Sequence, residues 1–263
     1  MAIEVFNRYE KKFLLDTGTY IKVLDILEQH MELDRYNREQ PYYTISNLYY
    51  DTEDDELIRK SIEKPQYKEK LRLRAYGVPS GGDLIFLEIK KKVKGLVNKR
   101  RTALTLEEAQ QFVETGKLPI RKNYMNWQVM QEIAYLLGQY RLIPRLYLAY
   151  DRRAYFGIGH SDLRISFDTN IRTRREDLDL ALGDCGKRLL GADTWLMEVK
   201  AEKTVPVWLS RMLSEMNIFS TNFSKYGTEY KAYLNKKQNG EEITCLTSYG
   251  VQVLTASLPL QAR

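Results

Sequence analysis

The sequence predicts an α+β fold in which antiparallel strands form the main sheet and helices pack on its outside. Two observations lead to this prediction. Many segments alternate apolar and charged side chains, which is the period of a strand with one buried face. A few others place apolar side chains three and four residues apart, which is the period of an amphipathic helix. The 263 residues contain no internal repeat and no Pro/Gly/Ser-rich linker, so we expect one domain over 1–235 and a tail of unassigned structure over 236–263.

Strands follow one another along most of the chain. They alternate in polarity or are rich in β-branched and aromatic residues. The expected strands are 4–15, 43–51, 68–77, 84–93, 96–104, 145–157, 163–172 and 194–203. Gly95 permits a tight turn between two of them, 84–93 and 96–104, which predicts a hairpin.

Helices occupy some of the intervals between these strands. Apolar residues recur at helical spacing in 17–31, 123–140 and 206–219. A further helix should begin after Thr105, because Thr105 and Glu108 have the spacing of a capping box. Gly116 should end that helix, since glycine readily adopts the left-handed conformation of a helix C-terminus.

Nearly every expected strand has one charged face and one apolar face. In 68–77, Lys70, Arg72 and Arg74 stand at every second position, with leucines between them. Because alternate side chains of a strand point to opposite faces, the three cations form a row. The charged faces of the other strands carry Arg8, Glu10 and Lys12; Glu88, Lys90 and Lys92; Arg152; Arg164; and Glu198, Lys200 and Glu202.

Two explanations account for such rows. The charged face of a single antiparallel strand is ordinarily a solvated face. A solvated face usually mixes both charge signs, because like charges opposite one another repel, whereas Lys and Arg dominate here. If the sheet curls into a barrel, the cationic faces line a tunnel and the apolar faces pack against helices. Unpaired buried charge is very costly, so a tunnel of this kind requires a polyanion with its metal ion to neutralise the cations. This explanation therefore predicts a site that binds a chain of phosphates.

Composition narrows the class of protein. The net charge of +6 favours anionic partners. No apolar run is long enough to span a bilayer, and the first residues lack the layout of a signal peptide, so we expect a cytoplasmic location without membrane insertion. Cys185 and Cys245 form neither a disulfide framework nor a metal-binding spacing.

Two further absences bear on partners. The sequence contains no Gly-x-x-x-x-Gly-Lys-Ser/Thr motif, so ATP would not be held by a P-loop. The basic strands show few aromatic residues on the same face, and single-strand binders need such residues for stacking, so we expect no nucleic acid. The pairs Arg100/Arg101 and Arg174/Arg175 are expected to be solvated charges near strand ends.

Seven segments resemble a known family in order and spacing. They are Lys12 on the first strand, "KLRLRAYG", "FLEIKKK", "YDRRAYFG", "LRISFDT", "LMEVKAEK" and "FSKYGTEY", and the resemblance as a whole covers about Val5 to Tyr233. This pattern resembles the triphosphate tunnel metalloenzymes and, among them, the VTC domain, a polyphosphate polymerase. The resemblance implies a closed tunnel of eight antiparallel strands that binds triphosphate or polyphosphate with a divalent metal ion, Mn²⁺ or Mg²⁺. In the VTC type, the γ-phosphate of ATP is transferred to a growing polyphosphate chain.

The resemblance also implies roles for individual residues. Phosphate ligands would be Lys12, Arg72, Arg74, Lys90, Arg152 and Lys200. Lys225 matches an essential lysine, and Glu198 matches the glutamate that holds the metal ion. We expect Lys70 and Arg164 to bind substrate as well, and Arg72, Arg74 and Lys225 to be catalytic.

Alternatives remain at several of these positions. Lys225 could be an ordinary exposed lysine, and Glu198 could pair with tunnel arginines without binding metal. Glu10 and Glu88 are expected to balance charge.

The first strand departs from the superfamily pattern Glu-x-Glu-x-Lys, because Arg8 stands where the first glutamate is expected. This departure weakens the interpretation as a hydrolytic triphosphatase or class IV adenylate cyclase, which use several carboxylates for two metal ions. Three functions stay open: an ATP-dependent polyphosphate polymerase, a metal-dependent hydrolase of inorganic or nucleoside triphosphates, and a non-catalytic polyphosphate-binding module. Coupling of synthesis to translocation would need a membrane-protein partner, since we expect neither a membrane span nor an SPX-like region here.

Overall fold

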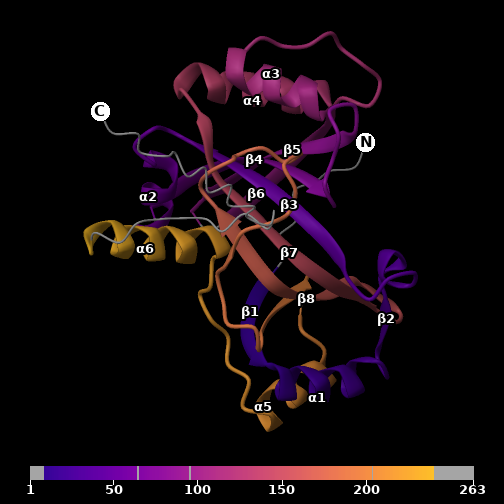
Figure 1. Ribbon diagram of the computed structural model, residues 1–263. Coiled ribbons are helices and arrows are strands. Elements are labelled where there is room, and N and C mark those ends of the chain that lie inside the picture. Colours follow the sequence, from indigo (N-terminus) through magenta and orange to yellow (C-terminus); the bar gives the residue numbers. More distant parts are fainter. Residues whose placement is uncertain (1–8, 64, 95, 203, 240–263) are drawn as a thin grey trace, which may run out of the picture.

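The computed structural model describes residues 9–63, 65–94, 96–202 and 204–239. The strands are β1 (Tyr9–Asp16), β2 (Met31–Leu33), β3 (Tyr43–Asp51), β4 (Tyr67–Tyr76), β5 (Leu84–Val93), β6 (Leu96–Thr105), β7 (Ile143–Gly157), β8 (His160–Arg174), β9 (Lys187–Arg188) and β10 (Thr194–Ala201). The helices are α1 (Thr17–Leu27), α2 (Glu56–Ile62), α3 (Leu106–Thr115), α4 (Trp127–Gln139), α5 (Val207–Glu215) and α6 (Lys225–Gln238), with a 3-10 turn η1 (Arg35–Asn37). Figure 1 shows the sheet in the middle, α3 and α4 above it, α1 and α5 below it, and α2 and α6 to the left.

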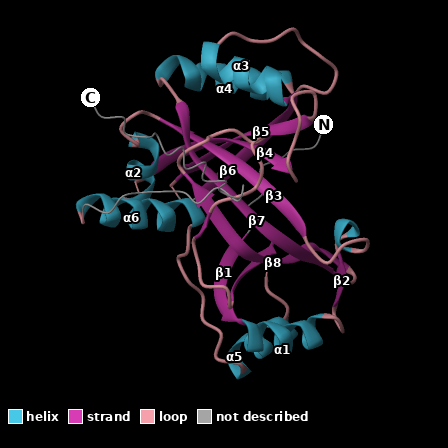
Figure 2. Ribbon diagram, viewed as in Figure 1, coloured by secondary structure: helices cyan, strands magenta, loops and turns pink. Residues whose placement is uncertain are grey.

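All the strand pairs are antiparallel, and the main path of the sheet runs β1-β10-β8-β7-β3-β4-β5-β6 (Figure 2). The short strand β2 pairs with β7, and β9 pairs with β8. The α+β prediction is therefore confirmed.

The closed barrel is not confirmed. In the described residues, β1 and β6 are the two ends of the hydrogen-bonded path and do not pair with each other. The edge of β1 that does not pair with β10 forms a hydrogen bond with a different segment, since the Thr221 N–H donates to the Lys12 carbonyl at 2.7 Å. The segment that leads into α6 thus borders β1 where a barrel would place β6.

The local signals in the sequence predicted several elements well. The strands expected at 43–51 and 84–93 have the bounds of β3 and β5. The capping box of α3 is present, because the Glu108 N–H donates to Thr105 Oγ1 at 3.2 Å and the Thr105 N–H donates to the Glu108 carboxylate at 3.0 Å. Gly116 ends α3 with φ of 68°, in the left-handed region that favours glycine.

Other elements were not predicted, namely β2, η1, α2, β9 and α6. Lys225 is the first residue of α6. Ser224 starts this helix by accepting a hydrogen bond from the Gly227 N–H at 3.2 Å. Helix α6 runs past the expected domain end at 235, and the expected segments 4–8 and 240–263 lie outside the described residues.

Apolar residues on one face of the sheet, the outer face, pack against four helices. Leu71, Leu73 and Leu87 belong to a buried cluster that α3 and α4 cover. Phe167 and Met197 belong to a second cluster, which α1 and α5 cover. The expectation that the apolar strand faces pack against helices is confirmed.

The opposite, inner face carries a third apolar cluster. Tyr49, Tyr150 and Leu196 pack there against Tyr226 and Tyr230 of α6. The inner face is therefore part apolar and part charged, and its apolar part is covered by α2 and α6. No helix in the described part of the chain has the length and apolar character needed to cross a membrane.

Helix α6 is attached to the rest of the molecule by buried polar contacts. Asp51, fully buried at the end of β3, accepts hydrogen bonds from the Leu57 N–H at 2.8 Å, the Ile58 N–H at 2.9 Å and the Tyr226 hydroxyl at 3.3 Å. One turn further along α6, Glu229 accepts two hydrogen bonds from the Arg175 guanidinium, at 2.8 and 2.7 Å. These contacts fix both the start of α2 and the orientation of α6.

We predict that Asp51→Asn lowers the free energy of unfolding by about 1–3 kcal/mol, because the new amide N–H groups would face backbone N–H donors and leave them unpaired. Urea unfolding followed by circular dichroism measures the effect. Asp54→Asn in the same loop is the control, since the Asp54 side chain is 64% exposed. Equal stability of the two variants would contradict the role given to Asp51.

Candidate anion-binding cavity

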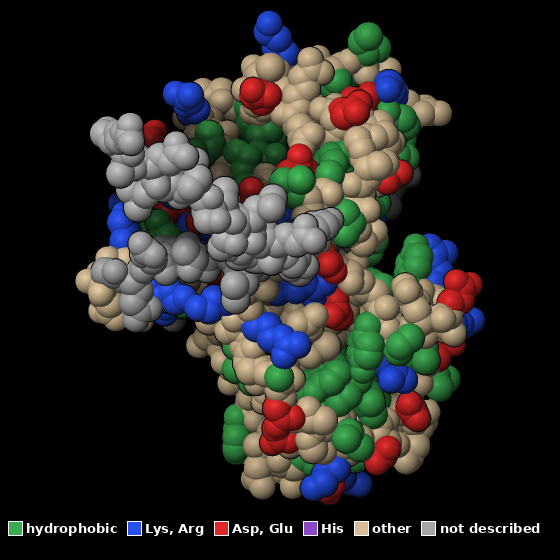
Figure 3. Space-filling view, in the orientation of Figure 1, with side chains coloured by type: hydrophobic (Ala, Val, Ile, Leu, Met, Phe, Trp, Pro, Cys, Tyr) green, Lys and Arg blue, Asp and Glu red, His purple; other side chains and the backbone are tan. Residues whose placement is uncertain are grey.

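A cavity of about 940 Å³ lies on the inner face of the sheet. Among described residues, its lining includes ten Lys and Arg side chains, from six strands and α6, against two carboxylates, Glu10 and Asp162. Figure 3 shows Lys and Arg side chains gathered between the part of the molecule that carries α3 and α4 and the part that carries α1 and α5. An excess of positive charge of this kind attracts anions.

Three lysines stand side by side in the cavity wall. Lys70 of β4 lies opposite Lys90 of β5, which in turn lies opposite Lys99 of β6. Like charges in this arrangement repel one another. Burial, together with Lys90, Lys68, Lys12 and Arg72, lowers the pKa of Lys70 to about 7. Burial also lowers the pKa of Lys99 to about 7, although Glu88 opposes this shift.

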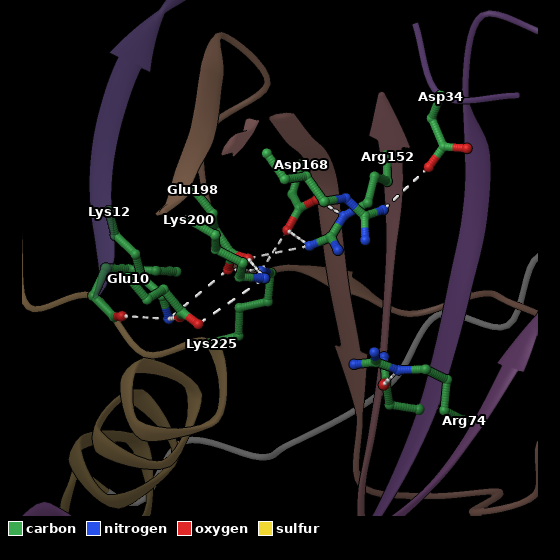
Figure 4. A network of polar contacts seen from close by, with 12 residues as sticks. Glu10, Lys12, Asp34, Arg74, Arg152, Asp168, Glu198, Lys200 and Lys225 are labelled. Carbon is green, nitrogen blue, oxygen red and sulfur yellow. Dashed lines mark hydrogen bonds and ion pairs between the residues drawn. The ribbon is translucent and has the colours of Figure 1, made fainter. Parts of the chain in front are cut away.

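A second group of charges, whose members are not among the residues lining the cavity, is held together by polar contacts (Figure 4). Arg152 of β7 donates to both oxygens of Asp168 on β8, at 2.6 and 2.8 Å, and to Glu198 of β10 at 3.3 Å. Lys225 of α6 donates to the same two carboxylates, to Asp168 at 2.5 Å and to Glu198 at 3.1 Å. Asp168 is fully buried and Glu198 is 6% exposed, so these contacts are shielded from water.

Two more lysines connect this group to the cavity. Lys200 lies 3.3 Å from Glu198, and Lys12 lies 3.8 Å from it. Lys12 also donates to the Phe223 carbonyl at 3.2 Å, which joins β1 to the segment before α6. Glu198 is therefore surrounded by four cations.

The protonation states follow from these contacts. Burial alone would raise the pKa of Glu198, but Lys225, Lys200, Arg152 and Lys12 hold it well below its usual range. Burial would likewise lower the pKa of Lys225, but Asp168 and Glu198 raise it above its ordinary value. Glu198 is thus ionised and Lys225 carries its proton.

Arg72 and Arg74 form a third group. Arg72 donates two hydrogen bonds to the Glu88 carboxylate, at 2.9 and 2.8 Å, and one to the Tyr49 hydroxyl at 2.7 Å. Arg74 donates to Asn47 at 3.0 Å and lies 3.7 Å from Glu88. Glu88, 1% exposed, therefore balances the charge of this group, in line with the sequence interpretation.

Tyr150 lies between the second and third groups. The Lys225 ammonium is 4.4 Å from the centre of its ring, and the Arg152 guanidinium is 5.1 Å from it. Burial would raise the pKa of the Tyr150 hydroxyl, but Arg152, Arg74 and Lys225 bring it below its ordinary value. The hydroxyl thus experiences the positive charge of both groups.

In the structure, the expected site residues form two sets: those that line the cavity and those that belong to the two groups of paired charges. Lys12, Lys70, Lys90, Arg164 and Lys200 line the cavity. The other expected residues, Arg72, Arg74, Arg152, Glu198 and Lys225, lie in the paired groups just described. Arg164 stands apart from both groups, because its guanidinium lies 3.2 Å from Asp34.

Sequence reasoning missed Asp168 and Tyr150. Asp168 could have been found, because it stands four residues after Arg164 on the same alternating face. Tyr150 carried no such signal, since it reads as one more aromatic residue of a strand.

Two other expectations were wrong. Arg174 is buried and donates to the carbonyls of Asp177, Gly183, Asp179 and Cys185, so it is not a solvated charge, whereas Arg101 is exposed and lines the cavity. Aromatic rings do accompany the basic residues: cations lie over the rings of Tyr49, Tyr150, Phe86, Phe156 and Tyr226. The reason given against nucleic acid therefore fails, and its absence stays a prediction.

The described residues contain no group of three or more His, Cys, Asp or Glu side chains that could hold a metal ion. Glu198 remains the expected ligand, with both of its oxygens engaged by cations.

Two sequence comparisons point to the same family. The family model described as VTC domain matches residues 7–234. The chain is 29% identical over 211 residues to the vacuolar transporter chaperone complex subunit 4 of Schizosaccharomyces pombe, a match that covers 72% of this chain and 29% of that protein. The chain therefore spans less than a third of the length of that relative.

Two solved structures are similar at 16% sequence identity. A candidate adenylate cyclase of Bacillus halodurans has a TM-score of 0.49, with 82% of this chain and 92% of that chain covered. A candidate adenylyl cyclase of Hippeastrum, described as having a dominant triphosphatase activity, has a TM-score of 0.48, with 89% and 96% covered.

We predict that inorganic triphosphate binds more weakly as the pH rises from 7 to 9. Lys70 and Lys99, with pKa values of about 7, lose their protons over this range, whereas a bound polyanion favours their charged form. The variant Lys70→Arg carries a positive charge at position 70 over the whole range from pH 7 to 9. It is therefore the control for changes in affinity that come from titration of the triphosphate itself. Relative to this variant, the wild type should lose about tenfold in affinity between pH 7 and 9, as measured by calorimetry. An unchanging ratio of the two affinities would contradict the assignment.

Proposed function

The chain belongs to the VTC domain family, and from this premise we propose that it is a polyphosphate polymerase that transfers the γ-phosphate of ATP to a growing polyphosphate chain. The observation that carries the proposal is the cavity with ten cationic side chains against two carboxylates. A linear polyanion suits this lining better than a single phosphate does. Successive inward residues of one strand, such as Lys68 and Lys70, are about 7 Å apart and can contact successive parts of one chain.

In this proposal the cavity serves as the tunnel of the family. Helix α6 and the segment before it would complete the wall where β1 and β6 do not pair. The contacts of Lys12 with Thr221 and Phe223 support this assignment.

The chemistry requires positioning and neutralisation of charge more than a reactive side chain. A terminal oxygen of the acceptor chain would attack the γ-phosphorus of ATP and form the new P–O bond. The bond from the γ-phosphorus to the oxygen that bridges it to the β-phosphate would break, and ADP would leave with that electron pair. Arg152 and Lys225 are suited to stabilise the developing charge, because Asp168 and Glu198 hold them in place before substrate arrives.

The charge of Glu198 suits a ligand for a divalent metal ion, but the cations around it compete with such an ion. Its carboxylate is ionised, and Mg²⁺ is commonly bound through one or two carboxylates together with substrate phosphates. Four cations neutralise this carboxylate in the free protein, so the phosphates would have to draw lysines away before an ion binds. Such an ion would supply charge neutralisation on the phosphate oxygens. The preference for Mn²⁺ or Mg²⁺, the cytoplasmic location and a membrane-protein partner stay predictions.

We expect purified protein with ATP and Mn²⁺ to produce a ladder of polyphosphate on a polyacrylamide gel, because the acceptor chain remains bound between transfers. Release of free phosphate without a ladder would favour the alternative of a triphosphatase in the same cavity. Binding of polyphosphate without any turnover would leave a non-catalytic binding module.

Glu198→Gln should lower kcat about a hundredfold or more, because the amide cannot supply the charge that a metal ion and Lys225 require. Binding of triphosphate without metal should persist, since the cations around residue 198 are retained. Mn²⁺ binding in the presence of triphosphate, followed by electron paramagnetic resonance, should weaken in parallel. Glu32→Gln, at a side chain that is 60% exposed, is the matched control. Unchanged Mn²⁺ binding would remove Glu198 as a metal ligand.

A further inference from the structure

An aromatic cluster lies beside the cavity. It consists of Tyr36 on η1, Tyr43 on β3, Tyr76 on β4 and Phe86 on β5. We propose that this cluster binds the base of a nucleoside triphosphate whose phosphates enter the cavity. The inference rests on the proposed function and adds to it a subsite for the nucleoside.

Tyr76 is the centre of the cluster. Its ring centre lies 6.3 Å from that of Tyr36, 6.1 Å from that of Tyr43 and 6.2 Å from that of Phe86. The planes of Tyr36 and Tyr76 are 15° from parallel, whereas Phe86 meets Tyr76 edge-on at 89°. Two nearly parallel rings are thus supported by two others.

The two parallel rings are half-exposed, and the Arg35 guanidinium lies 4.7 Å from the centre of the Tyr36 ring. Tyr36 and Tyr76 are each 53% exposed, although large aromatic side chains usually bury most of their surface. A nucleobase could cover such rings, because every base has a flat π-face that stacks on an aromatic side chain.

The cluster is continuous with the phosphate site. Arg101, which lines the cavity, lies 4.3 Å from the centre of the Phe86 ring. Arg164, which also lines the cavity, donates to the Tyr43 hydroxyl at 3.4 Å. On β5, Phe86 and Lys90 are four residues apart, about 13 Å along the strand, so a ribose and its first phosphates can connect the rings with the lysines.

The turn that carries Tyr36 is held rigidly against β7. Asn37, 5% exposed, donates to the Arg152 carbonyl at 3.2 Å and accepts from the Ala154 N–H at 2.9 Å. The Asp34 N–H donates to the Ala154 carbonyl at 2.8 Å. Binding to a surface fixed in advance costs little conformational entropy, which favours a preformed stacking site.

The test compares two ligands that differ only in the nucleoside: a non-hydrolysable ATP analogue with an imido group between its β- and γ-phosphates, and inorganic imidotriphosphate. The double variant Tyr36→Ala/Tyr76→Ala should weaken binding of the analogue about tenfold or more and change binding of the triphosphate less than twofold. Tyr36→Phe/Tyr76→Phe retains both rings and should bind the analogue as the wild type does. Tyr135→Ala is the control, because Tyr135 of α4 is 69% exposed and outside the cluster.

The possible results distinguish failure of the nucleoside subsite from failure of the proposed function. Equal loss of affinity for both ligands would overturn the subsite, since the rings would then only support the cavity. Unchanged affinity for the analogue in the double alanine variant, with an unaltered thermal unfolding midpoint, would also overturn it. If the wild type binds neither ligand, the proposed function itself fails.

Discussion

The balance between buried carboxylates and buried cations is the constraint on which this structure depends. Asp168, Glu198 and Glu88 lie on the inner face and each contacts two or more Lys or Arg side chains. Removing one partner of such a pair leaves an uncompensated buried charge, which is strongly destabilising. The carboxylates do not balance every cation, because Lys70 and Lys90 stand opposite one another with lowered pKa values. The remaining positive charge is what the proposed polyanion would neutralise.

This charged face determines where the hydrophobic cores lie. A sheet that carries charged residues on one face must bury its apolar residues mainly on the other face. Here two apolar clusters lie on the outer face, one covered by α3 and α4 and the other by α1 and α5. Within the described ranges, the inner face contributes one apolar cluster, next to α2 and α6. The cavity therefore occupies a place that a hydrophobic core fills in most sheets covered by helices.

The period of two in polarity, and local signals such as Thr105 with Glu108, were enough to predict most strands and the start of α3. Helix α6 escaped prediction because Gly227 stands in its first turn and its sequence is largely polar, so that tertiary contacts rather than propensity stabilise it. The inward direction of the cationic rows could be proposed from the sequence. The pairing of Asp168 with both Arg152 and Lys225 could not, since it joins three elements far apart along the chain. The failure of β1 and β6 to pair likewise depends on a segment near Thr221 that no periodic pattern marks.

Three contacts in succession hold helix α6 in place. They are Lys225 with Asp168, Tyr226 with Asp51 and Glu229 with Arg175. Three such points determine both the rotation of a helix about its axis and its shift along it. The position of Lys225 is therefore set by contacts with β8, with β3 and with the residue that follows β8, and not only by the segment that leads into α6.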